Sequence, residues 1–234
     1  MTYDHERAEG VLGPVQTLAF GERTGVLPPK PLCGALPPQN ADFRGLAEDY
    51  LLSRDLDPEL AFSINGWYPA EIEGIPRLVI PATSANRENR YWQARDISGG
   101  ALKRWESPHG VSRGDALVMT WPAVSLSGAN KSPVVCVEGP MDALAASGEG
   151  CLAIAFMGVT PPPEAISFAV QLIGPSRALL VMDADQPKAM VALLEEFSAA
   201  KVRSALVTPY PFKDLAEADR RSRRAILAGY GVSP

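Results

Sequence analysis

From Val134 to Leu144 the chain reads VVCVEGPMDAL. The first four residues form a continuous apolar run, which is typical of a strand buried on both faces of a sheet. The run ends at Glu138 and Gly139, and a helical stretch follows from Met141 to Ser147. A buried strand that passes directly into a helix predicts one unit of a parallel α/β sheet.

The C-terminal part of the chain repeats this alternation of apolar runs and helical stretches. Further buried strands are predicted at 151–156, 178–182 and 202–207, and helices at 163–173, 187–200 and 214–228. Strands that alternate with helices pair in one parallel sheet, because each helix carries the chain back across a face of that sheet. Residues 129–234 are therefore expected to form a parallel sheet with helices on both faces.

The chain before residue 129 has a different pattern. Residues 1–42 contain two proline clusters, which disfavour helices and central strands and predict an extended arm or linker. Downstream of this arm we expect helices at 42–53 and 57–62 and strands at 77–81, 90–95 and 116–120. The expected fold class is α/β, in which a smaller α+β basic subdomain, residues 43–128, precedes the parallel sheet.

The composition is that of an ordinary globular protein. Of 234 residues, 46% are hydrophobic and 21% are charged, which is enough apolar material for a buried core. No apolar run is long enough for a transmembrane helix, the first residues are polar, and three cysteines are too few for a disulfide scaffold. These features argue against a membrane partner and predict a cytoplasmic protein.

The net charge of −5 hides a basic band in the middle of the chain. Residues 77–113 carry seven basic and three acidic side chains, whereas residues 1–76 carry five basic and twelve acidic ones. Tyr91, Trp92 and Trp105 lie among these basic residues, and aromatic faces stack on bases. The band is compatible with contacts to nucleic-acid phosphates, and its alternative is a solvated face of a sheet.

Carboxylates stand where the predicted parallel strands end. Glu138 ends the first buried strand with Asp142 one helical turn on, and Asp183 and Asp185 follow the third. Ligands of open α/β sheets bind at the carboxyl ends of the strands. Clustered carboxylates repel one another unless a cation neutralises them, and oxygen ligands suit Mg²⁺. The alternative is that these acids only cap helices or face solvent.

In this order the residues resemble the Toprim domain. Residues 137–144 (VEGPMDAL) look like its strand followed by Glu-Gly-x-x-Asp-Ala, and residues 181–185 (VMDAD) look like its Asp-x-Asp motif. Gly158-Val159-Thr160 stands at its Gly-Thr turn, and residues 211–214 (PFKD) are similar to its late Lys-Asp motif. Toprim domains occur in DnaG-type primases, in topoisomerases, in the recombination protein RecR and in some nucleases.

The upstream half resembles the DnaG-type primases. Residues 50–56 (YLLSRDL) are similar to their Tyr-Leu-x-x-Arg-Gly helix, and residues 75–81 (IPRLVIP) to a strand with arginine, three apolar residues and proline. Residues 91–95 (YWQAR) look like their strand that ends in arginine, and residues 103–108 (KRWESP) like Lys-Tyr-x-x-Ser-Pro. The resemblance covers about residues 43–230 and implies a primase catalytic core.

The resemblance implies a role for each matching residue. Glu138, Asp183 and Asp185 would hold a catalytic Mg²⁺ or Mn²⁺. Asp142 and Asp214 would complete the acidic site or bind a second ion, and Lys213 would neutralise phosphate. The basic residues that would hold template and incoming nucleotide are Arg54, Arg77, Arg95, Lys103 or Arg104, and Arg113.

This reading makes the protein a primase core that synthesises short RNA primers on single-stranded DNA. The expected partners are the DNA template and ribonucleoside triphosphates. Neither a zinc ribbon nor a helicase-binding domain is recognisable in the sequence. A helicase and a separate zinc-binding protein would therefore act from other chains, as expected for a shortened version from a phage or mobile element.

The sequence also departs from the family pattern. Ala216 stands where the family often has the last acid of Lys-Asp-x-Asp, and Asp55 stands where a glycine usually follows Arg54. Two alternatives stay open. One is a Toprim nuclease with the same acidic site, and the other is a non-catalytic primase-like protein that binds nucleic acid or a replication partner. Ala216 favours the second of these.

Overall fold

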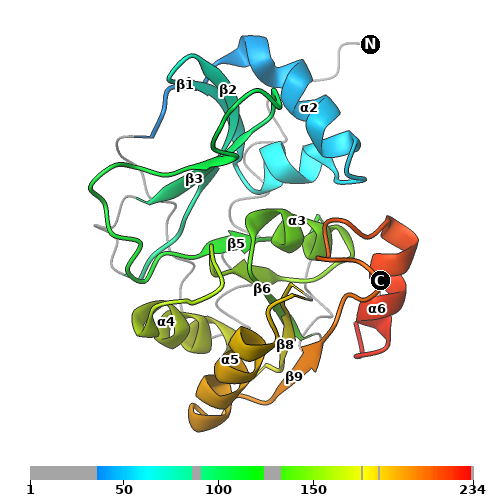
Figure 1. Ribbon diagram of the computed structural model, residues 1–234. Coiled ribbons are helices and arrows are strands. Elements are labelled where there is room, and N and C mark those ends of the chain that lie inside the picture. The colour runs from blue at the N-terminus through cyan, green and yellow to red at the C-terminus, as the bar shows by residue number, and fades with distance from the viewer. Residues whose placement is uncertain (1–35, 86–90, 124–132, 175, 184, 233–234) are drawn as a thin grey trace, which may run out of the picture.

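The structure is a computed structural model, and it describes residues 36–85, 91–123, 133–174, 176–183 and 185–232. Among these residues the strands form two sheets. A four-stranded sheet (the small sheet) has the order β1-β2-β3-β4, and a five-stranded sheet (the large sheet) has the order β5-β7-β6-β8-β9. The two sheets lie at opposite ends of the molecule, with helix α3 between them (Figure 1).

The small sheet is antiparallel throughout. Its strands are β1 (Tyr68–Ile72), β2 (Ile75–Pro81), β3 (Trp92–Asp96) and β4 (Trp105–Glu106). The side chains of β2 alternate between the two faces of the sheet, as the period of a strand requires. Leu78 and Ile80 enter the main core, whereas Val79 packs with Trp92 on the other face. The strands β2 and β3 had been predicted, but β1 and β4 had not.

Two helical segments precede the small sheet and cover the face with Leu78 and Ile80. A 3₁₀ turn η2 (Ala41–Phe43) leads into α2 (Arg44–Leu52), and a π-helical turn η3 (Leu60–Ile64) follows. Most of the predicted arm, residues 1–35, lies outside the described residues. The segment that follows it is extended, since Gln39 pairs with Ala70 across an isolated bridge.

The large sheet confirms the predicted parallel α/β layer. Strands β6 (Val134–Val137), β7 (Ala153–Ala155), β8 (Ala178–Val181) and β9 (Ser204–Val207) run parallel. Strand β5 (Val118–Thr120) pairs antiparallel with β7 at one edge. This edge strand comes from the segment before residue 128, so the upstream half of the chain completes the large sheet.

Helices cover both faces of the large sheet. The helices α4 (Pro163–Ile173) and α5 (Pro187–Ala199) pack on one face, and α3 (Pro140–Gly148) and α6 (Arg220–Ala228) pack on the other. In the part of the chain that the structure describes, no helix is long and apolar enough to cross a membrane. The predicted last helix starts later than expected, because Asp219 caps the N-terminus of α6 and residues 214–218 form turns.

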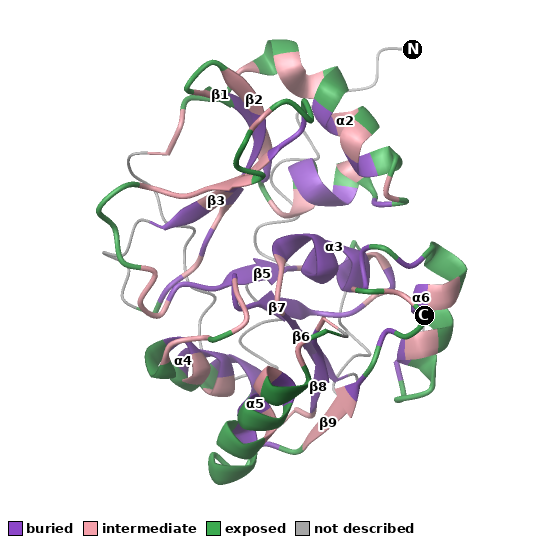
Figure 2. Cartoon of the chain, viewed as in Figure 1, coloured by how far each residue is buried: buried purple, intermediate pink, exposed green. Residues whose placement is uncertain are grey.

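The two halves share one hydrophobic core. Every residue of α3 from Pro140 to Ser147 is buried, because α3 packs on the large sheet on one side and on the upstream half on the other (Figure 2). Polar contacts also cross this junction. The Asn65 amide exchanges hydrogen bonds of 2.7 and 3.2 Å with the Trp121 backbone, and Thr120 Oγ1 donates to Ala143 O over 2.8 Å. Shared burial and these bonds fix the halves relative to each other.

Asp96 closes the loop between β3 and β4. Its carboxylate is 6% exposed and accepts hydrogen bonds from the backbone N–H groups of Ser98, Gly99 and Ala101. Burial by itself raises the Asp96 pKa, but these bonds and one from the Ser98 hydroxyl outweigh it, so the pKa lies below its usual range. Asp96 thus holds a turn that the sequence indicates only through Gly99 and Gly100.

We expect Asp96→Asn to lower the free energy of unfolding by about 1–2 kcal/mol, because an amide nitrogen cannot accept the Ala101 N–H. A lowered pKa means that the contribution of Asp96 is present above the unfolded-state pKa near 4 and is lost as the pH falls through the folded-state pKa. Urea titrations of both proteins at pH 7 and pH 3 measure this. The difference should shrink at pH 3, and an equal difference at both values would contradict the assignment.

Candidate functional site

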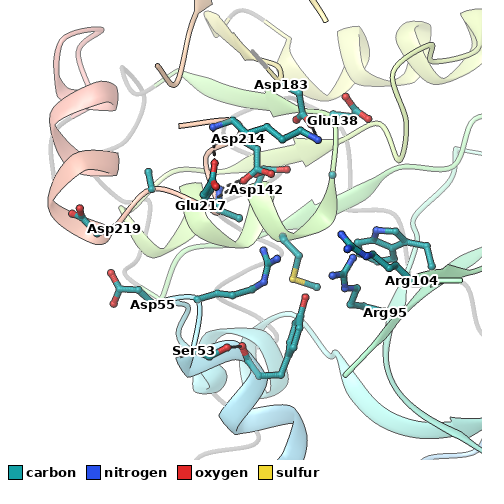
Figure 3. A pocket seen from close by; sticks show the side chains of 18 of the residues that line it. Ser53, Asp55, Arg95, Arg104, Glu138, Asp142, Asp183, Asp214, Glu217 and Asp219 are labelled. Carbon is teal, nitrogen blue, oxygen red and sulfur yellow. Dashed lines mark hydrogen bonds and ion pairs between the residues drawn. The ribbon is translucent and has the colours of Figure 1, made fainter. Parts of the chain in front are cut away.

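A cleft of about 790 Å³ lies between the two halves of the molecule. Its walls come from the end of α2, from β3 and β4, from the β6–α3 junction, and from residues 213–219 (Figure 3). Arg95 and Arg104 lie on one side of this cleft, and Glu138, Asp142, Asp183 and Asp214 lie on another. The residues that line it are Tyr50, Leu52, Ser53, Arg54, Asp55, Arg95, Arg104, Trp105, Glu138, Gly139, Met141, Asp142, Asp183, Lys213, Asp214, Ala216, Glu217, Ala218 and Asp219.

The acidic wall follows from the strand order. Strands β6 and β8 are neighbouring parallel strands, so their carboxyl ends lie side by side. Glu138 after β6 and Asp183 after β8 therefore lie at the same end of the sheet. Asp142 lies in the first turn of α3, and Asp214 lies beside it in the cleft (Figure 3). The predicted acids Glu138, Asp142, Asp183 and Asp214 thus meet in one place. Asp185 is not among the lining residues and joins the group through Lys213.

The crowding of these carboxylates raises their pKa values. Burial, followed by the charges of Asp183 and Asp185, raises the pKa of Glu138 to about 7. Burial and the charge of Asp214 raise the pKa of Asp183 to about 6. The pKa of Asp142 is also raised, first by burial and then by Asp214. Such shifts mean that the site holds more negative charge than its surroundings stabilise, and they are common at functional sites.

Lys213 supplies positive charge at this wall. Its Nζ lies 3.6 Å from Asp185 Oδ2 and 3.9 Å from Asp183 Oδ2, and its side chain is 58% exposed. The two aspartates raise the pKa of Lys213. The backbone around it is fixed, because Lys213 N donates to Glu217 Oε2 and Glu217 N donates to Asp214 Oδ1, both over 2.7 Å. The ammonium group can therefore move while its backbone stays in place.

Ala216, which stands where the primase motif often has an acid, lies among the residues that line the cleft. Its side chain is buried, and its backbone N–H donates to Asp142 Oδ1 over 2.9 Å. This bond opposes the rise in the Asp142 pKa. Glu217 does not take over the missing position as a free carboxylate, since it accepts the Lys213 N–H. The departure at residue 216 thus removes one charge from the acidic wall.

Three of the predicted basic residues, Arg54, Arg95 and Arg104, line the cleft opposite the carboxylates. Arg95 and Arg104 lie together on the far side from Asp183 and Asp142 in Figure 3. The Arg95 Cζ lies 5.3 Å from the centre of the Trp105 ring and 5.8 Å from that of Tyr50. The Arg54 Cζ lies 5.5 Å from the same Tyr50 ring. Arg54 and Arg95 are thus held against aromatic faces, which favours an ordered arrangement of positive charge.

The other predicted basic residues lie elsewhere. Arg77 is only 3% exposed and donates to the Lys103 carbonyl, so it holds the loop before β4. The Lys103 side chain is exposed and does not line the cleft. Arg113 donates to Met157 O and Thr160 O, both over 2.8 Å, and thereby ties its segment to the turn after β7. The structure gives Arg77 and Arg113 structural contacts that their sequence positions do not reveal.

The donors of the acidic wall suit a divalent cation. They are all oxygen atoms, which Mg²⁺ and Mn²⁺ prefer. Glu138 Oε2 is buried and has no hydrogen-bond partner among the described residues, and an unpartnered buried carboxylate oxygen is costly. Among the same residues, however, no three Asp, Glu, His or Cys side chains gather closely enough to surround one ion. The chemistry fits a metal, and the side chains would have to move closer together to hold it.

Comparisons with known proteins support the fold. No protein-family model and no curated protein sequence matches the chain. The RNA polymerase domain of Mycobacterium tuberculosis primase DnaG matches with a TM-score of 0.56 and 15% identity, over 81% of this chain and 77% of that one. A DnaG primase catalytic domain bound to single-stranded DNA matches with 0.56 and 14%, over 92% and 77%. The primase fragment of the bacteriophage T7 primase-helicase protein matches with 0.54 and 17%, over 87% and 81%. The chain has the fold of a DnaG-type primase catalytic domain.

Proposed function

We propose that this protein is a DnaG-like primase core that synthesises short RNA primers on single-stranded DNA. The observation that supports this most is the cleft, which brings one buried and three half-buried carboxylates together with three arginines. A nucleotidyl transferase needs both, because phosphates must be held close to the group that activates them. The fold shared with primase catalytic domains is consistent with this chemistry.

The chain's own residues would act mainly by positioning. Arg95 and Arg104 would hold phosphates of the template strand or of the incoming nucleotide, with Trp105 beside them. Arg54, which lies against the same Tyr50 ring as Arg95, would do the same. Holding both reactants in line lets the 3′-hydroxyl attack the α-phosphate while pyrophosphate leaves.

Glu138, Asp183 and Asp185 are the residues that would hold a divalent cation, Mg²⁺ or Mn²⁺. When bound, the ion would neutralise charge on the triphosphate and orient the attacking oxygen. Lys213 would leave its place between the two aspartates and turn toward phosphate, which its exposure permits. Asp142 and Asp214 would add negative charge around the ion or help to hold a second one.

A second function, binding of nucleic acid without catalysis, is favoured by two observations. Lys213 already neutralises Asp183 and Asp185, and Ala216 removes one acid from the wall. In that case the arginines would bind single-stranded DNA and no phosphate would be transferred. A helicase or a separate zinc-binding protein could act with the chain under either proposal.

A primer-synthesis assay distinguishes these functions. The purified chain is incubated with single-stranded DNA, labelled ribonucleotides and Mg²⁺ or Mn²⁺, with and without a zinc-binding protein encoded nearby. We expect metal-dependent RNA products that an Asp183→Asn/Asp185→Asn variant does not make. The matched control is Glu195→Gln/Glu196→Gln, which removes two exposed acids from α5 outside the cleft.

Each outcome decides between the alternatives. Degradation of the DNA that requires Asp183 and Asp185 would identify a nuclease. Binding of DNA that weakens with salt, with neither RNA product nor degradation under any condition, would leave the non-catalytic function. Equal RNA synthesis by the Asp183→Asn/Asp185→Asn variant would exclude the proposed acidic site.

A further inference from the structure

The turn that follows α2 has an unusual backbone. Asp55 has a φ of 54°, in the left-handed region that favours glycine, and it comes directly after Arg54 at the rim of the cleft. An aspartate tolerates this conformation better than most residues but still at a cost. Backbone hydrogen bonds within the turn close it, from Asp55 N to Leu52 O and from Leu56 N to Leu51 O, both over 3.0 Å. Contacts from outside the turn can add support to Asp55.

Helix α6 provides that support through three contacts to Asp55. The Arg220 N–H, in the first turn of α6, donates to Asp55 Oδ2 over 2.7 Å. Arg223 Nη2 lies 3.3 Å from the same oxygen and also donates to the Asp55 carbonyl. The carbonyl and the carboxylate of a single residue are thus both bound by a helix that lies 165 residues or more along the chain.

Arg223 is itself fixed from the other side. Its side chain is 2% exposed, and its Nε lies 3.9 Å from Oε1 of Glu149, whose side chain is also 2% exposed. Glu149 follows the C-terminal end of α3, so its position depends on the large sheet and its core. An arginine that is buried between two acids has few other positions open to it. A continuous chain of contacts therefore runs from α3 through Glu149 and Arg223 to Asp55.

We propose that Arg223 and Asp55 are positioning residues, which hold the Arg54 turn so that the Arg54 guanidinium faces nucleic acid in the cleft. The inference rests on the proposed function of the cleft. The inference adds that the position of Arg54, in the upstream half, depends on α6, which packs on the large sheet. A glycine at position 55 would permit the turn, whereas the Asp55 carboxylate also ties the turn to α6.

The substitution Asp55→Gly tests this because two effects have opposite signs. Glycine keeps the φ of 54° without strain and removes only the carboxylate, which is 56% exposed. Removing a negative charge from the cleft should, by charge alone, strengthen binding of a polyanion. Loss of the support for Arg54 should weaken it. The direction of the change thus reports which effect is larger.

Glu73→Gly is a matched control. Glu73 is also an exposed acid with a positive φ, 53°, and it lies in the β1–β2 turn outside the cleft. Both variants therefore lose one negative charge and gain one glycine at a position that suits glycine. Each is also made in an Arg54→Ala background, since a loss of binding that acts through Arg54 disappears once Arg54 is absent and only the effect of charge remains.

The measurement is the affinity of the full chain for a fluorescent single-stranded oligonucleotide at two salt concentrations. We expect Asp55→Gly to bind about threefold to tenfold more weakly than wild type, a range typical of contacting, coupled residues. We expect Glu73→Gly to bind as wild type does. In the Arg54→Ala background, Asp55→Gly should cause no further loss.

Hydrogen exchange of a peptide that covers residues 51–57 tests the support without DNA, and it should be faster in Asp55→Gly than in Glu73→Gly. Unchanged exchange, unchanged or tighter DNA binding by Asp55→Gly, or an equal loss in the Arg54→Ala background would each overturn the inference and leave the proposed function intact. Absence of DNA binding by the wild-type chain would overturn both.

Discussion

Glu138→Gln is expected to reduce metal-dependent primer synthesis by about a thousandfold while making the fold more stable at pH 8. The activity should fall because a neutral amide is a much weaker ligand for a divalent cation, and losing several kcal/mol of transition-state stabilisation corresponds to such a factor. The stability should rise because the buried Glu138 oxygen has no partner among the described residues. Opposite changes in activity and stability are a mark of a functional site.

The stability difference should depend on pH in a defined direction. The folded protein raises the Glu138 pKa from 4.5 to about 7, so the folded state binds this proton more tightly than the unfolded state does. The stability of the wild type therefore falls as the pH rises from about 4.5 to about 7, and it stays lower above that range. Glutamine does not titrate, so the stability of the variant relative to the wild type should increase between pH 5 and pH 8.

Thermal unfolding at pH 5 and pH 8, with and without Mn²⁺, measures this. Added Mn²⁺ should raise the melting temperature of the wild type at pH 8 more than that of the variant. Glu73→Gln serves as the control, since it removes an exposed carboxylate in the β1–β2 turn. A variant that is less stable at pH 8 would show that the charged Glu138 carboxylate does not destabilise the fold. A variant that keeps full activity would show that Glu138 does not hold the metal.

The sequence was sufficient to predict the features that depend on local pattern and strand order. Apolar runs identify the parallel strands of the large sheet, and the acids that follow β6 and β8 meet because these strands are neighbours. The sequence thus predicts one site for Glu138, Asp142 and Asp183, and all three line the cleft. The roles of Arg54, Arg95 and Arg104 were implied only by the resemblance to primase motifs, and the structure places these three residues in the cleft lining.

The features that depend on tertiary contacts could not be predicted. Arg77 is buried at 3% exposure, and its guanidinium donates to the Lys103 carbonyl 26 residues away in the loop before β4. Arg113 is engaged by carbonyl groups 44 and 47 residues away. Strand β4 has two residues and no pattern of its own. Arg77 and Arg113 bind carbonyls 26 or more residues away, and β4 is defined only by its pairing with β3, so none of the three has a signal of its own in the sequence.

The run of four arginines on α6 shows the same limit. A run of charges of this kind usually marks a solvated helix face, and Arg221 is indeed exposed. Arg223, however, is buried, while Arg220 and Arg224 lie 3.6 and 3.2 Å from Glu149 oxygens. Helical spacing turns the third residue of the run toward α3. Glu149 is the residue that makes this possible, and nothing in its sequence context marks it.

Arg223→Met is expected to lower the free energy of unfolding by about 2–4 kcal/mol, because it leaves the Glu149 carboxylate buried with weaker partners. The loss is below that of a fully isolated charge, since Arg220 and Arg224 still face Glu149. For a chain of this size the melting temperature should fall by roughly 5–15 °C. Arg221→Met, the same change at an exposed position of the same helix, should shift stability by less than about 0.5 kcal/mol.

The double variant Arg223→Met/Glu149→Met decides whether the charge or the shape of the pair matters. Replacing both members of a buried ion pair by apolar residues of similar size is often neutral, whereas removing one member is costly. The double variant should therefore recover most of the stability that Arg223→Met loses, measured by urea unfolding at pH 7. If the double variant is less stable than Arg223→Met, Glu149 stabilises the protein without Arg223, through its ion pairs with Arg220 and Arg224. The buried pair of Arg223 with Glu149 would then not account for the loss in Arg223→Met.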